Sequence, residues 1–100
     1  MGAFVQIVEY QTSRYDEVKA MADQYRESIA GKGGPRHVTM TSDRDRPGTF
    51  VTVAHFDSYD AAMANSNAPE TQQFAEQMQK LCDGPATFRN LDVEKTFDIS

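Results

Sequence analysis

Histidine is the side chain best suited to acid–base chemistry near neutral pH, and the chain holds two, His37 and His55. Either could act as a general base on a bound molecule, and His55 lies in the middle of the most strongly strand-forming stretch. A histidine in a strand can equally be a hydrogen-bonded structural residue. The two are far apart in sequence, with no His-x-His or Glu-x-x-His pattern, so the sequence predicts no metal site.

Two further polar groups need an explanation. Gln6 interrupts an apolar strand face, and burying its amide without a partner would cost about 1–3 kcal/mol. It therefore either has an internal partner or points into a cavity that holds water or ligand. Cys82 is the single cysteine and has no disulfide partner. It falls near a predicted helix C-terminus, where the dipole opposes thiolate formation, so we expect no nucleophile there.

Apolar side chains that could line a binding pocket occur on the predicted strands and helices. Tyr10 offers a phenol, and Met78 offers a flexible thioether. Phe56 and Phe74 offer aromatic rings. The same residue types also commonly pack in a hydrophobic core. The sequence leaves both interpretations open: a pocket for a small hydrophobic molecule, or a space filled by Met and Phe side chains.

The elements that would position these groups are organised around residues 50–56, a β-branched and aromatic run typical of an inner strand. Asp57 and Ser58 follow with side-chain oxygens that can cap a helix. Pro47 and Gly48 suit the centre of a type II turn before that strand. Capping boxes are indicated at Ser13 with Asp16 and at Asn67 with Glu70. The predicted strands and helices cover residues 3–11, 13–29, 36–42, 50–56, 58–66, 69–82 and 86–97.

This order is β-α-β-β-α-β, which predicts a single α+β domain over residues 1–100 with a ferredoxin-like, four-stranded antiparallel sheet. Helices would cover one face of that sheet. The strands are apolar on both faces, however, as Val5 and Ile7 show on the first strand. We therefore expect a homodimer in which two sheets pack around a two-fold axis.

Composition excludes several classes of function. The net charge of −5 provides no basic surface for nucleic acid and disfavours anionic membranes. No apolar run approaches the length of a spanning helix, and the first residues show no signal-peptide pattern. A cytoplasmic location is the simplest expectation.

The segment Phe56-Asp57-Ser58-Tyr59-Asp60-Ala61 is similar to an aromatic-x-Ser-x-Glu-Ala motif, and the helix break from Asn65 to Pro69 follows it. On these motifs the chain resembles the dimeric α+β barrel superfamily that contains the antibiotic-biosynthesis monooxygenases. The resemblance extends from Phe4 to about Phe97. It implies an oxygenase that needs no cofactor and acts on a hydrophobic aromatic or polyketide-type molecule.

The resemblance also implies site residues. Asn65 corresponds to the family's Asn, which would orient a hydroxyl or carbonyl, and Arg89 to its Arg, which would stabilise an anion. Asn65 could instead cap the helix break, and Arg89 could pair with nearby carboxylates. The family's Trp and Tyr positions correspond to Pro69 and Ala75. The expected set is therefore Asn65, Arg89 and His55 for catalysis, and Gln6, Tyr10, Phe56, Phe74 and Met78 for binding. The alternative is a stress-responsive or small-molecule-binding protein that does not catalyse.

Overall fold

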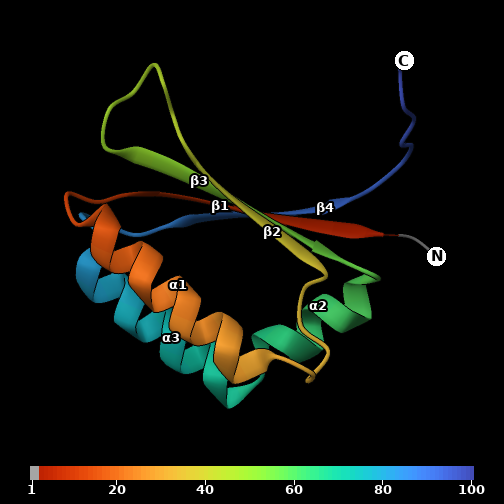
Figure 1. The fold of residues 1–100 in the computed structure, drawn as a ribbon, viewed down its shortest axis with the longest axis horizontal. Helices are drawn as coiled ribbons and strands as arrows, with labels where there is room; N and C mark the ends of the chain where they lie inside the picture. The colour runs from red at the N-terminus through yellow and green to blue at the C-terminus, as the bar shows by residue number, and fades with distance from the viewer. Residues whose placement is uncertain (1–2) are drawn as a thin grey trace.

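The computed structural model describes residues 3–100 and contains a four-stranded antiparallel sheet with three helices on one side (Figure 1). The sheet order is β2-β3-β1-β4, so the two halves of the chain interleave. This is the predicted ferredoxin-like arrangement, with the second helix split in two. The elements are β1 Phe4–Gln11, α1 Tyr15–Ile29, β2 His37–Ser42, β3 Thr49–Phe56, α2 Tyr59–Ser66, α3 Pro69–Leu81 and β4 Thr87–Asp92.

The strand register assigns every side chain of the sheet to a face. Phe4 pairs with Phe56 and Tyr10 with Phe50, and these side chains lie on the helix side. Because side chains alternate along a strand, Gln6 shares that side, whereas Val5 and Ile7 point away from the helices. We call the two surfaces the helix-facing side and the helix-free side.

Tight packing is concentrated at the two ends of the helix-facing side. Phe4, Phe56 and Ala62 form one buried cluster, and the ring of Tyr59 meets Phe4 edge-on at 5.4 Å between centroids. These contacts hold α2 against β1 and β3. The burial of apolar area supplies most of the free energy that joins the two layers.

At the opposite end, Tyr15 stacks on Phe50 with 3.8 Å between ring centroids. The Thr12 hydroxyl donates to the carbonyl of Leu81 at 2.6 Å and accepts from the backbone N–H of Arg14 at 2.9 Å. Thr12 therefore ties the start of α1 to the end of α3.

One predicted helix cap is confirmed and two are wrong. The Ser58 hydroxyl accepts from the backbone N–H of Ala61 at 3.0 Å, as expected for an N-cap. Helix α1 begins after Arg14 with no side-chain cap, since Thr12 already serves Arg14. Helix α3 begins after Ala68, because the backbone of Asn67 closes α2 instead.

The last strand is shorter than predicted. It ends at Asp92, opposite Phe4, and the ladder closes with the N–H of Val93 bonded to the carbonyl of Ala3 at 3.0 Å. This bond is the last one between the two strands within residues 3–100. The remaining C-terminal residues run away from the sheet on the helix-free side (Figure 1).

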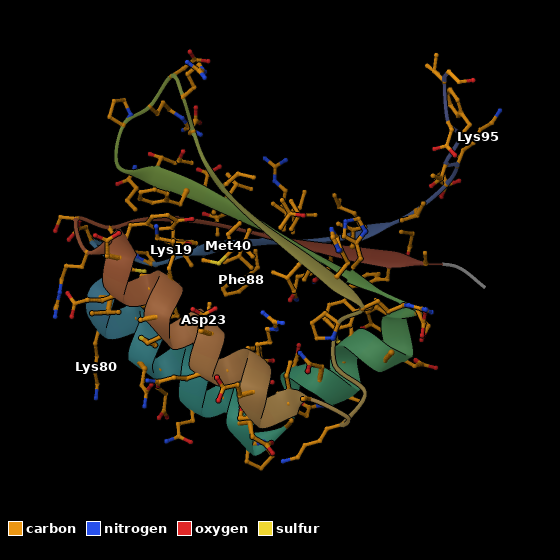
Figure 2. The ribbon with its side chains drawn as sticks, in the orientation of Figure 1. Lys19, Asp23, Met40, Lys80, Phe88 and Lys95 are labelled. Carbon is orange, nitrogen blue, oxygen red and sulfur yellow. The ribbon has the colours of Figure 1, made fainter. Side chains whose placement is uncertain are left out.

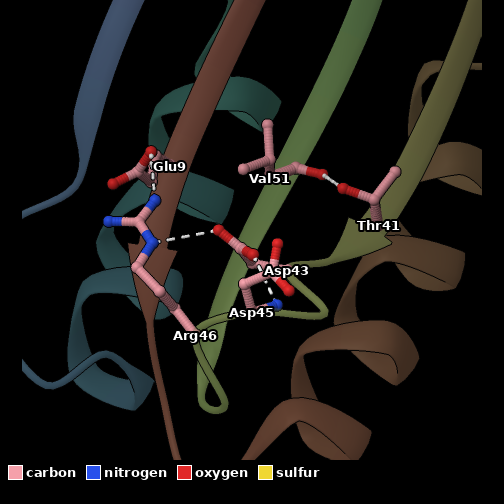
Figure 3. A network of polar contacts seen from close by, with 6 residues as sticks. All are labelled: Glu9, Thr41, Asp43, Asp45, Arg46 and Val51. Carbon is pink, nitrogen blue, oxygen red and sulfur yellow. Dashed lines mark hydrogen bonds and ion pairs between the residues drawn. The ribbon is translucent and has the colours of Figure 1, made fainter.

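Polar contacts fix the β2–β3 hairpin to the central strand. Arg46 donates to Asp43 at 3.0 Å and reaches Glu9 of β1 at 3.4 Å (Figure 3). The N–H of Thr49 bonds to the carbonyl of Arg46, and Gly48 has φ +86°, as a type II turn requires. The predicted Pro-Gly turn is therefore present.

Candidate functional site

The middle of the helix-facing side is open to solvent, although its ends are packed. Phe88 of β4 exposes 59 % of its surface, and Val8 and Met40 are only half-buried. Figure 2 shows Met40 and Phe88 pointing from the sheet toward α1 and α3. The closest packing of helices on the sheet involves α2, while α1 packs mainly on α3. Phe88, Val8 and Met40 therefore form a partly accessible apolar surface on the sheet face toward the helices.

An amide pair lies on this surface. Gln6 Nε2 donates to Asn90 Oδ1 at 3.1 Å, and the register places the two residues side by side on β1 and β4. Gln6 therefore has an internal partner, which is the first of the two possibilities that its place in the sequence left open. The pair still has a free Gln6 carbonyl oxygen and a free Asn90 N–H group to offer to a ligand.

Tyr10 supplies a second polar group on the same face of β1. Its side chain is only 3 % exposed, and its hydroxyl has no hydrogen-bond partner among residues 3–100. Burial raises the pKa of the Tyr10 phenol. The neighbouring Thr52 hydroxyl offsets part of that rise, yet it does not reach hydrogen-bonding geometry. Tyr10 therefore stays protonated at neutral pH and can donate to a ligand oxygen.

Asn65 lies in a hydrogen-bonded junction of all three helices. Its Nδ2 donates to the Tyr25 hydroxyl at 3.2 Å, and that hydroxyl is 2.7 Å from Thr71 Oγ1. The Tyr25 ring stacks on Phe74 at 4.6 Å between centroids. A Cβ on Gly34 would approach Asn65 Oδ1 to 3.2 Å, so this glycine leaves room for the amide.

The other two expected catalytic residues lie elsewhere. Arg89 pairs with Ile7 and His55 with Val5, which places both on the helix-free side. Asn65 is on the helix side, so the structure does not bring the three together around one pocket. No ion pair involves Arg89 within the described residues.

The remaining residues that the sequence proposed for binding are Phe56, Phe74 and Met78, and they pack within the fold. Phe56 is part of the buried cluster with Phe4 and Ala62. Phe74 and Met78 are half-buried on α3. A shallow groove of about 530 Å³ runs between α1 and α3, lined by residues such as Arg14, Glu17 and Lys80. This groove lies between the two helices, whereas the sequence predicted a pocket between the sheet and the helices.

Metal-binding and thiol chemistry have little support on the helix-facing side. Among residues 3–100, no group of three or more His, Cys, Asp or Glu side chains could hold a metal ion together. Burial raises the pKa of the Cys82 thiol, which keeps it protonated. Within the same part of the chain, none of the helices has the length and apolar character to cross a membrane.

Sequence reasoning missed Asn90 and Thr52, and it did not connect Tyr25 with Asn65. Asn90 could have been found from strand alternation, because it neighbours Arg89 and must face the opposite side. The sequence offers the Tyr25 phenol as one of several possible polar groups and places Tyr25 in the apolar stripe of the first helix. Its role depends on contacts with Asn65 and Thr71, 40 and 46 residues away, which no local pattern reveals.

Solved structures share this arrangement. SnoaB, a cofactor-independent oxygenase from Streptomyces nogalater, superimposes with a TM-score of 0.81 over 96 % of this chain and 97 % of its own, at 14 % identity. A candidate antibiotic biosynthesis monooxygenase from Caulobacter crescentus gives a TM-score of 0.81 over 94 % and 92 %, at 13 % identity. The chain has the antibiotic biosynthesis monooxygenase fold. The expected resemblance in fold is therefore confirmed.

A further candidate monooxygenase of this fold, from Nitrosomonas europaea, gives a TM-score of 0.76 over 93 % of this chain and 92 % of its own, at 14 % identity. No family model matches the chain, and neither does any curated protein. At such identities the likeness concerns the fold, and activity has to be argued from this chain's own side chains.

Proposed function

We propose that the chain is a cofactor-independent monooxygenase of a small hydrophobic aromatic molecule, bound between the sheet and the helices. The observation that carries the proposal is the Tyr10 hydroxyl, which is buried without a partner among residues 3–100 and belongs to the same sheet face as the exposed Phe88. A buried hydroxyl without a partner costs free energy, and a ligand oxygen would supply the missing bond. The amide pair of Gln6 and Asn90 offers a second polar contact on the same face.

The side chains on this face suit a substrate that ionises readily by itself. Neither histidine lies there, and Tyr10 keeps its proton, so the chain offers donors rather than a strong base. An anthrone-type substrate loses a carbon-bound proton to water to give an electron-rich enolate. Tyr10 and Asn90 would stabilise the enolate oxygen by hydrogen bonding.

Oxygen then reacts with this anion directly. One oxygen atom becomes the new carbonyl of the quinone, the other leaves as water, and the substrate provides all of the electrons. The part played by the protein is therefore to bind the ring system, stabilise the anion and hold it where oxygen can reach it.

The test is oxygen consumption with anthrone, measured with an electrode and corrected for spontaneous oxidation. The wild-type protein should accelerate the uptake of oxygen and the appearance of quinone absorbance. Tyr10→Phe and Asn90→Ala should each lower kcat/KM, by about tenfold for a lost bond to an anion. Tyr59→Phe is the matched control, because Tyr59 is exposed and outside the site. Equal rates in all four proteins would refute the proposal.

Binding without catalysis is the second candidate, and the location of Arg89 and His55 on the helix-free side favours it. A binder would gain thermal stability from an aromatic ligand while consuming no oxygen. That stabilisation should still disappear in Tyr10→Phe. The two candidate functions therefore use the same site and differ in whether oxygen is consumed.

A half-buried free thiol at Cys82 suits the reducing cytoplasm, the location that we expect.

We also propose that two copies pair through the helix-free side. An apolar strip crosses it, and Leu91 within the strip is 41 % exposed. The C-terminal tail runs on the same side and holds Phe97 and Ile99 at 67 % and 87 % exposure. A second copy would cover both. The strip consists of Val5, Ile7, Val51, Val53 and Leu91.

Sedimentation equilibrium tests this pairing. Leu91→Lys places a charge in the strip and should convert a dimer to a monomer at micromolar concentration. Gln73→Lys, on the exposed surface of α3, is the control and should leave the mass unchanged. A wild-type monomer over the whole concentration range would refute the proposed dimer.

A further inference from the structure

His37 and His55 form a cross-strand pair on the helix-free side. The register places His37 of β2 directly opposite His55 of β3, and their ring centroids are 5.5 Å apart with the planes tilted by 57°. The residues are 18 positions apart in sequence, and the hairpin alone brings them together. Both side chains are exposed within the chain.

The spacing of the two rings suits a shared metal ion. A first-row divalent metal bonds imidazole nitrogen at about 2.0–2.1 Å, which puts the centroids of two chelating rings about 4.5–5.5 Å apart. The observed separation is at the upper end of that range, so small side-chain rotations would bring one nitrogen of each ring to the metal. Imidazole is a preferred ligand for zinc, copper and nickel.

The ring nitrogens are largely free for coordination. His37 Nε2 is 3.2 Å from Thr39 Oγ1, and within residues 3–100 the other ring nitrogens of the pair have no hydrogen-bond partner. The nearest ion pair along the chain joins Arg36 to Asp57 at 2.7 Å, so each charge there already has its partner. The negative net charge of the protein favours a cation over an anion.

We propose that His37 and His55 chelate one divalent transition-metal ion, with water molecules completing its coordination. The absence of a third His, Cys, Asp or Glu ligand in the described residues makes this an open site. The site needs the two imidazoles of a single chain, so it does not depend on the proposed oxygenase activity.

Calorimetric titration with Ni²⁺ and Zn²⁺ tests the site, using the full-length, tag-free protein. A Cys82→Ser background removes the one thiol that could compete for these ions. We expect one ion per chain, and loss of that binding in His37→Gln and in His55→Gln. Binding that survives in the double variant, or no saturable binding in the unmodified chain, would overturn the proposal.

A second measurement avoids any variant that might fold poorly. The chain has only these two histidines, so their ring signals are readily assigned in a ¹H–¹⁵N NMR spectrum. Addition of Zn²⁺ should shift the signals of both rings together and saturate at one equivalent. A shift confined to one ring would show simple monodentate binding and would contradict the chelate.

Discussion

Replacing single tyrosines by phenylalanine tests whether the Tyr10 hydroxyl is unpaired in the ligand-free protein and can therefore bond to a ligand. Tyr10→Phe removes a buried hydroxyl that has no partner in the described part of the chain, so no hydrogen bond within residues 3–100 is lost. An unpaired buried group costs about 1–3 kcal/mol, and the free energy of unfolding should therefore rise by at least about 1 kcal/mol. For a domain of this size that corresponds to an increase in Tm of about 4–8 °C.

Two other tyrosines serve as internal standards for the same substitution. The Tyr25 hydroxyl bonds to Thr71 at 2.7 Å and to Asn65 at 3.2 Å, so Tyr25→Phe should lower the free energy of unfolding by about 1–1.5 kcal/mol. The ring stack on Phe74 is kept in that variant. Tyr59 is exposed, and Tyr59→Phe should change the free energy by less than about 0.5 kcal/mol.

Chemical denaturation in urea, without ligand, gives the three free energies under the same conditions. The expected order of stability is Tyr10→Phe, then Tyr59→Phe, then Tyr25→Phe. A loss of 1 kcal/mol or more in Tyr10→Phe, as in Tyr25→Phe, would show that the Tyr10 hydroxyl is already satisfied, by Thr52 or by bound water. The argument for a ligand oxygen at Tyr10 would then fail.

Three more predictions concern local features. In an ultraviolet titration, Tyr10 should ionise above the usual pH range of a tyrosine, because burial raises its pKa. Since its folded pKa is raised, its contribution to stability is present below the unfolded pKa and is lost as the pH rises through the folded pKa. Ser58→Ala should lower the free energy of unfolding by about 1 kcal/mol, measured in urea, because the N–H of Ala61 loses its cap. Gly34→Ala should shift the side-chain amide signals of Asn65 in an NMR spectrum, because the added Cβ at position 34 would come within 3.2 Å of Asn65 Oδ1. Unchanged signals would contradict that contact.

Local chemistry was enough to predict most of the fold. Alternation on the strands, the Pro-Gly turn and the Ser58 cap each depend on neighbours within a few residues, and all are present. The two incorrect caps failed for different reasons: Thr12 is held by Leu81 at the distant end of α3, whereas the backbone of Asn67 closes the preceding helix α2. The length of β4 likewise depended on where β1 begins.

In the candidate site, the difference between what the sequence determined and what the tertiary structure decided is larger than in the fold. Sequence alone determined the α+β class, the apolar character of both sheet faces and the presence of polar groups such as Gln6 on them. Only the tertiary structure decided that Arg89 and His55 face away from Asn65, that Tyr10 has an unpaired hydroxyl, and that His37 meets His55. The physical reason is that register and helix packing are set by contacts between distant segments. A shift of one residue in register would move every side chain of a strand to the other face.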